Sequence, residues 1–172
     1  MLAETFVVRA PKWAPEPFFF FVLGGEDPAD HVQREEIRRG DPHPLLGQIV
    51  RIHVTEEARH ISFARNYLRQ AVPRMHRVRR RLVAVQVPLI MALMTRLILV
   101  PPRDLRHHCG MPDEVARAAM RSPEGRRLLA DCARKVRDLC DELGLMTPAA
   151  RRVWRATGVS APATEQDHGP TR

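Results

Sequence analysis

Three residues in the stretch VRIHVTEEARHISFARNYL, positions 50–68, have the types and the spacing of metal ligands. His53, Glu57 and His60 follow one another at intervals of four and three residues. On a helix these intervals keep the three side chains within about 60° of one another, on successive turns of one face. Two imidazoles and one carboxylate suit ferrous iron or manganese and leave coordination positions open for oxygen chemistry. The spacing is neither His-Glu-x-x-His nor His-x-x-Glu-His, so it does not favour a zinc protease.

Two long helices must position these side chains. The segment 44–72 carries all three residues, has helical periodicity throughout and stops at Pro73. Before it, the aromatic run at 18–21 and a Gly-Gly pair precede a second helix. We expect that helix to begin with Asp27 as its cap and Pro28 in its first turn.

Further helices follow toward the C-terminus. Two of them begin after the N-caps Ser122 and Thr147, each followed by a proline, and close at Gly144 and Gly158. No run of alternating apolar and polar residues bounded by turns predicts a strand. The sequence therefore predicts an all-α fold.

The cysteines argue against thiolate chemistry. Cys109, Cys132 and Cys140 form no Cys-x-x-Cys pair and are odd in number, so they predict neither a zinc site nor a disulfide framework. Cys132 and Cys140 fall on the apolar stripe of a helix, which is typical of core residues. Reduced thiols, and an N-terminus without the pattern of a signal peptide, indicate a cytoplasmic protein.

Charge and hydropathy leave two other classes to weigh. The formal net charge is +8, almost all of it from arginine, but the arginines alternate with acidic residues and aromatic residues make up only 5% of the chain. Binding to nucleic acid is therefore not expected. The apolar segment 82–100 has the length of a membrane span. It contains Gln86, Pro88 and Arg96, so we expect a helix covered on most sides by other helices and not a span.

A wider stretch carries a resemblance to a known family. Glu57-Ala-Arg-His60 is a Glu-x-x-His pair of the kind that ferritin-like di-iron bundles place on facing helices. The stretch GGEDPADHVQREE, followed by HPLLGQIVRIHVTEEARHISFAR, resembles the di-iron oxygenases of the para-aminobenzoate N-oxygenase (AurF-like) family. The resemblance covers positions 15–105, and the His-x-x-x-Glu-x-x-His helix of that family is matched by His53, Glu57 and His60.

The resemblance implies a fourth ligand and a chemistry. The family has a glutamate ligand on the preceding helix, which we place at Glu26, with Glu35 and Glu36 as rivals. The implied fold is a ferritin-like helical bundle. Its site holds two irons, with manganese as the other option, and uses dioxygen to oxidise a small organic substrate, an arylamine nitrogen in the named members. The residues identify neither the substrate nor the electron donor.

Only half of the ligand set of the family is visible. In the family an earlier pair of helices supplies a further glutamate and a second Glu-x-x-His, but the only acidic residues upstream of Glu26 are Glu4 and Glu16, with no histidine. Asp104-Leu-Arg-His107 imitates the spacing, yet it follows a Pro-Pro pair and is expected to lie in a loop. We therefore expect an incomplete bundle, a truncated form of such an oxygenase, with one metal in place of two.

An incomplete bundle has consequences for domains and partners. We expect one partial domain over 1–159 and, from its polar composition, a disordered tail over 160–172. Without the missing helices, the aromatic run and residues such as Ile49, Ile52 and Ile61 would lack cover. The expected partners are thus a second copy of the chain or a complementary N-terminal fragment, besides a small-molecule substrate. The alternative function is a catalytically inactive remnant, or a partner-dependent helical module that binds one metal or none.

Overall fold

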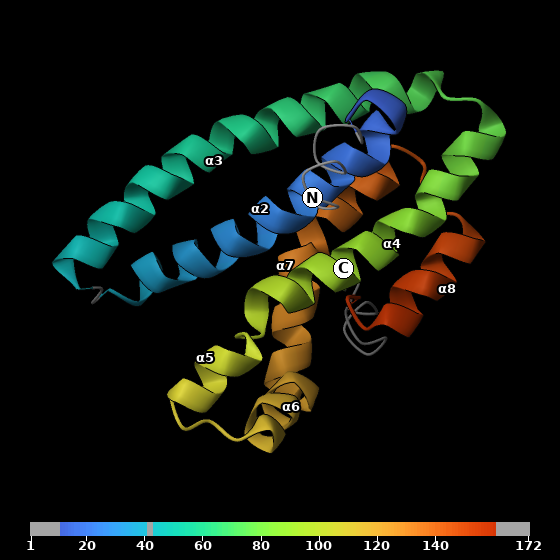
Figure 1. Cartoon of the computed structure of the whole chain (residues 1–172). Helices are drawn as coiled ribbons and strands as arrows, with labels where there is room; N and C mark the ends of the chain where they lie inside the picture. Colours follow the sequence, from blue (N-terminus) through green and yellow to red (C-terminus); the bar gives the residue numbers. More distant parts are fainter. Residues whose placement is uncertain (1–10, 41–42, 161–172) are drawn as a thin grey trace, which may run out of the picture.

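The computed structural model describes residues 11–40 and 43–160 (Figure 1). Within these ranges the chain is helical and contains no strand, so the predicted all-α class is confirmed. The predicted disordered tail falls outside the described residues except for Ser160. The elements in order are α2 (Pro15–Arg39), α3 (Pro44–Ala71), the short 3-10 turn η1 (Val72–Arg74), α4 (Arg77–Leu99), α5 (Arg103–His108), α6 (Asp113–Arg121), α7 (Pro123–Glu142) and α8 (Pro148–Thr157).

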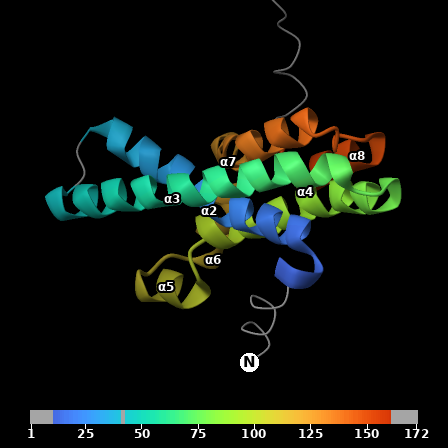
Figure 2. The same cartoon turned by 90° about the horizontal axis from the view of Figure 1, so that it is seen from above.

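Helix α2 is the centre of the arrangement. It packs against α3, against α4 and against α7, while α8 packs on α4. Helices α2 and α3 run antiparallel as a long hairpin, and α7 crosses α2 (Figures 1 and 2). Phe20 and Leu23 of α2, Leu68 of α3 and Met91 of α4 are fully buried in the shared core. The fold therefore holds α2 on three sides, and α3 extends along one of them.

The expected start of α2 is wrong. One helix runs without interruption from Pro15 to Arg39, so Asp27 is not a cap and Pro28 lies inside the helix. Proline and glycine are poor helix formers, and local propensity alone favours a break here. Tertiary contacts override it, because Gly24 lets α4 approach so closely that a Cβ at this position would meet Met94 at 3.1 Å.

Helices α3, α7 and α8 match the predictions. Helix α3 ends at Ala71 and passes into the 3-10 turn that contains the expected stop at Pro73. The hydroxyl of Ser122 accepts a hydrogen bond from the Gly125 N–H, and that of Thr147 accepts one from the Ala150 N–H. Gly144 and Gly158 follow the ends of these helices with left-handed φ angles of 64° and 72°. Capping residues read from the sequence thus set these boundaries.

The cysteines lie as predicted. Cys132 and Cys140 are buried on the core side of α7, whereas Cys109 is exposed after α5. Burial raises the pKa of the Cys132 thiol to about 12 and raises the pKa of Cys140 as well. Both buried thiols therefore stay protonated and unreactive at neutral pH.

Helix α4 differs from the expectation of a helix covered on most sides. Its inner face is buried, but Leu82, Leu89, Leu93 and Leu97 are all more than half exposed along one stripe. The helical stretch Arg77–His108 has the length and hydropathy of a membrane span, with 39% of its most apolar window buried. Core helices of soluble proteins share that length and hydropathy, so these two properties do not identify a span. The exposed leucines are the feature that needs a partner.

Candidate metal centre

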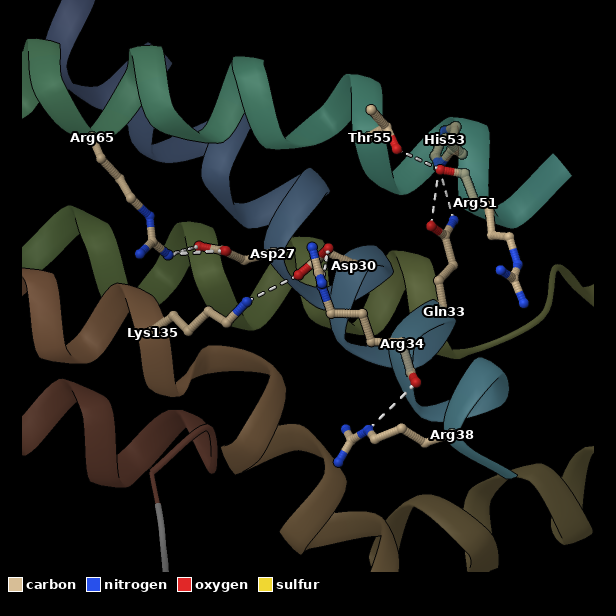
Figure 3. Close-up of polar contacts among 10 residues, drawn as sticks. All are labelled: Asp27, Asp30, Gln33, Arg34, Arg38, Arg51, His53, Thr55, Arg65 and Lys135. Carbon is tan, nitrogen blue, oxygen red and sulfur yellow. Dashed lines mark hydrogen bonds and ion pairs between the residues drawn. The ribbon is translucent and has the colours of Figure 1, made fainter. Parts of the chain in front are cut away.

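The α2–α3 hairpin brings the predicted ligands together in a ladder of side-chain pairs. The Nδ1 atom of His60 lies 3.3 Å from Oε1 of Glu26. Seven residues further along α2 and seven residues back along α3, the Gln33 amide lies 2.9 Å (Nε2) and 3.1 Å (Oε1) from Nδ1 of His53. This pair is drawn in Figure 3. Seven residues in the other direction, the rings of Phe19 and Tyr67 pack with centroids 4.4 Å apart.

Glu57 completes the cluster from α3 itself. Its Oε1 atom lies 3.2 Å from Nε2 of His53, one helical turn away, and its side chain is only 11% exposed. Both nitrogens of the His53 ring are therefore held, Nδ1 by Gln33 and Nε2 by Glu57. Such a partner at the second ring nitrogen fixes the orientation of a ligating histidine.

Two carboxylate oxygens of the cluster are left without a partner. Oε2 of Glu26 and Oε2 of Glu57 are buried and accept no hydrogen bond from protein. Burial raises the pKa of both groups, and the adjacent Glu57 raises the pKa of Glu26 further, against the opposing effect of His60. Buried anionic oxygens without donors are costly, and a bound cation removes that cost. The two histidines and two carboxylates thus have the composition of a divalent metal site, and the two oxygens without hydrogen-bond donors are free to bind the ion.

The cluster is not assembled around a common point. Across residues 11–40 and 43–160, no three His, Cys, Asp or Glu side chains are grouped so that they could hold one ion. The four side chains pair two by two, Glu26 with His60 and Glu57 with His53. Metal binding would therefore exchange these side-chain contacts for metal bonds. Their assignment as ligands stays a prediction.

A buried ion-pair network holds α2 against α3 and α7 beside the cluster. Arg65 donates to both oxygens of Asp27 at 2.9 and 2.8 Å (Figure 3). Asp30 accepts from Lys135 of α7 at 2.9 Å and from Arg34 at 2.6 Å. These pairs fix the rotation and register of α2, and with them the position of the cluster. These roles of Asp27, Asp30, Arg65 and Gln33 were not predicted from the sequence; the seven-residue interval from Glu26 to Gln33 is a signal that could have indicated one of them.

Of the rival residues, Glu35 and His107 make their contacts away from the cluster. Glu35 pairs with Arg38 at 2.7 Å on the exposed side of α2. His107 belongs to helix α5 and not to a loop, which corrects the expectation, since the residues after the Pro-Pro pair form a short helix. Its Nε2 atom lies 3.8 Å from Asp113, a carboxylate already bound by Arg106. Neither residue contributes to the cluster on the hairpin.

Comparisons with known proteins now give this geometry a context. The model of the family "P-aminobenzoate N-oxygenase AurF" matches residues 1–144. This match is longer than the stretch 15–105 that carries the resemblance in the sequence. An uncharacterised protein of Mycobacterium tuberculosis strain CDC 1551 / Oshkosh is 40% identical over 160 residues, which are 92% of this chain and 47% of that protein. An uncharacterised protein of Mycobacterium bovis is 39% identical over the same shares. No solved structure matches the chain.

The chain spans about half the length of the curated relatives that it matches. The family match covers the whole α2–α3 hairpin, with Glu26, His53, Glu57 and His60, and continues through α7. The helical architecture agrees with a ferritin-like bundle. On these grounds the chain belongs to the P-aminobenzoate N-oxygenase AurF family.

Proposed function

We propose that this chain is a non-haem di-iron oxygenase of AurF type, which carries out the dioxygen-dependent oxidation of a small organic substrate. The observation that supports this most directly is the pair of buried, partnerless oxygens, Oε2 of Glu26 and Oε2 of Glu57, between two histidines. The residues that would hold the metal are Glu26, His53, Glu57 and His60. Iron at such a site supplies the binding and activation of dioxygen, with manganese as the alternative ion.

The side chains around the ligands position them. Gln33 holds Nδ1 of His53, which leaves Nε2 as the nitrogen on the side of Glu57. The Asp27–Arg65 pair, one residue after Glu26 and five after His60, keeps α2 in register with α3. Because the ion pair is buried, the hairpin resists the rotation that would separate the two ligand-bearing turns.

An apolar groove offers a place for an aromatic substrate. It has a volume of about 330 Å³ and lies between α2 and α4, lined chiefly by Phe18, Phe21, Leu89 and Ile90. Phe18 precedes Glu26 by eight residues, about 12 Å along the helix axis. Apolar walls of this size suit a single substituted ring. An arylamine is therefore the substrate class that we infer, consistent with the family description.

One observation favours a second candidate function. The side chains of the cluster form two pairs, Glu26 with His60 and Glu57 with His53, and do not converge on one point. A chain that keeps them would be a helical module that binds one metal weakly or none. Counting bound metal separates the two functions.

The test is anaerobic reconstitution of the purified chain with ferrous iron or Mn²⁺, followed by metal analysis and calorimetry. We expect about one ion per chain, because one hairpin supplies four ligands. His60→Ala should lower the affinity about 100-fold or more, whereas His107→Ala, on α5, should leave it unchanged. Equal losses in both variants, or no binding at all, would overturn the assignment of the ligands. Two tightly bound ions per chain would overturn only the count of four ligands.

A further inference from the structure

The side of α2 that faces away from α7 lacks cover. Val22 is only half-buried and Val32 is exposed on this side. On the flanking helices, Ile49 and Phe63 of α3 are 53% and 64% exposed, and Leu89 and Leu93 of α4 are 52% and 56% exposed. We call these six residues the open face. Exposed apolar surface shared by three adjacent helices is typical of a surface that binds another polypeptide.

The ligand cluster borders the open face and is incomplete by itself. His53 and His60 are exposed on α3 between Ile49 and Phe63, whereas the carboxylates of Glu26 and Glu57 point inward. A ferritin-like site for two metal ions takes one glutamate from each of two helices and a Glu-x-x-His pair from each of two others. The α2–α3 hairpin supplies one of each kind. A second hairpin of the same composition supplies the remainder.

We propose that two copies of this chain join through the open face and share one site for two metal ions, with Glu26, His53, Glu57 and His60 contributed by each copy. The proposal rests on the metal-binding function proposed above. A two-fold axis through the cluster places the same surface patch on both sides of the contact, so the assembly closes as a dimer.

Charge makes the contact between the two copies depend on metal. Each hairpin brings two carboxylates, Glu26 and Glu57, with one unpartnered oxygen apiece. Two hairpins together bring four negative charges, which two divalent ions neutralise. Without the ions the four carboxylates would be forced together, and their mutual repulsion and loss of water oppose association. Dimer formation and metal binding should therefore occur together.

The experiment is sedimentation velocity of the full chain with Mn²⁺ or with EDTA, combined with electron paramagnetic resonance of the bound Mn²⁺. We expect monomer in EDTA, and with Mn²⁺ a dimer that holds two ions whose spins are exchange-coupled. Leu93→Glu places a charge on the open face away from the ligands; it should abolish the dimer and lower the Mn²⁺ affinity at least tenfold. Leu105→Glu, at a residue 52% exposed on α5, is the matched control and should change neither.

The outcomes separate this inference from the function on which it rests. One uncoupled ion bound to a chain that stays monomeric would overturn the shared site, would leave the metal-binding function standing, and would assign the open face to a different occupant. A dimer that forms equally in EDTA and survives Leu93→Glu would place the contact on another surface and overturn the inference. Absence of bound Mn²⁺ in every state would overturn both proposals. Circular dichroism of each variant confirms that the helices are retained.

Discussion

Replacing Arg65 with methionine tests how the hairpin is held in register. Arg65 donates both of its hydrogen bonds to Asp27, whose side chain has no exposure to solvent. Removing one partner of a buried ion pair costs about 3–5 kcal/mol, because the other charge is left without compensation. Arg65 is 22% exposed and Lys135 also lies near Asp27, so we expect the lower end, a loss of about 3 kcal/mol in the free energy of unfolding.

The assay is urea unfolding in EDTA, followed by circular dichroism, with Arg69→Met as the control. Arg69 lies one turn further along α3 and makes an ion pair of similar geometry with Glu142, at 2.8 and 3.0 Å. The side chains of Arg69 and Glu142 are both about half exposed. Solvent screens such a pair, so Arg69→Met should lower the stability by only a small fraction of the Arg65 effect. Equal losses in the two variants would show that burial of Asp27 does not determine the cost, and would refute the reasoning.

The same variant has a defined pH dependence. Burial raises the pKa of Asp27, and Arg65 opposes the rise. Without Arg65 the folded-state pKa rises further above the unfolded value, so the folded variant takes up a proton more readily than the unfolded chain. Its stability therefore recovers as pH falls through that folded pKa. The difference between wild type and Arg65→Met should be smaller at about pH 5 than at about pH 8. A difference that widens on acidification would contradict this assignment.

Two further predictions concern packing. A thiol reagent should label one thiol per folded chain, Cys109, and all three thiols after denaturation. Cys132 and Cys140 are protected because they are buried and their thiol pKa values are raised. Rapid labelling of three thiols in the folded chain would disprove the buried placement. Gly25→Ala should raise the free energy of unfolding by about 0.5–1 kcal/mol through helix propensity, since its Cβ meets only the flexible end of Met94 at 3.5 Å. Gly24→Ala should lose that gain, because its Cβ would lie 3.1 Å from the Cβ and Cγ atoms of Met94; equal thermal melts of the two variants would count against close packing of α2 on α4.

Much of the fold followed from local signals. The caps at Ser122 and Thr147 and the stop near Pro73 are short-range features, and the structure has them where the sequence put them. Helix α2 is different, because Gly24 and Pro28 predicted a break that packing against α4 prevents. Local propensity is a weak guide wherever tertiary contacts of this kind compete with it.

The site divides in the same way. The spacing of His53 and His60 lies within one helix, so the sequence alone predicted that they share a face. Glu26 was predicted from the family resemblance. The roles of Gln33 and Arg65 depend on how α2 lies against α3, which no local pattern contains. The sequence analysis expects α2 to begin at Asp27, so it does not place residues 15–26 on the same helix as residues 27–39. The register of α2 against α3 could therefore not be inferred from the sequence.

The ladder of Phe19–Tyr67, Glu26–His60 and Gln33–His53 has a mechanical consequence. A repeat of seven residues drifts by about 20° per step on a straight helix, so rungs at this interval stay aligned only when the two helices wind around each other in a left-handed supercoil. The pitch of such a supercoil is a property of the whole pair. A larger or smaller side chain at Phe19 should therefore change the relative twist of α2 and α3 at the polar pairs as well. A substitution at Phe19 should thus alter the geometry at Glu26, seven residues away.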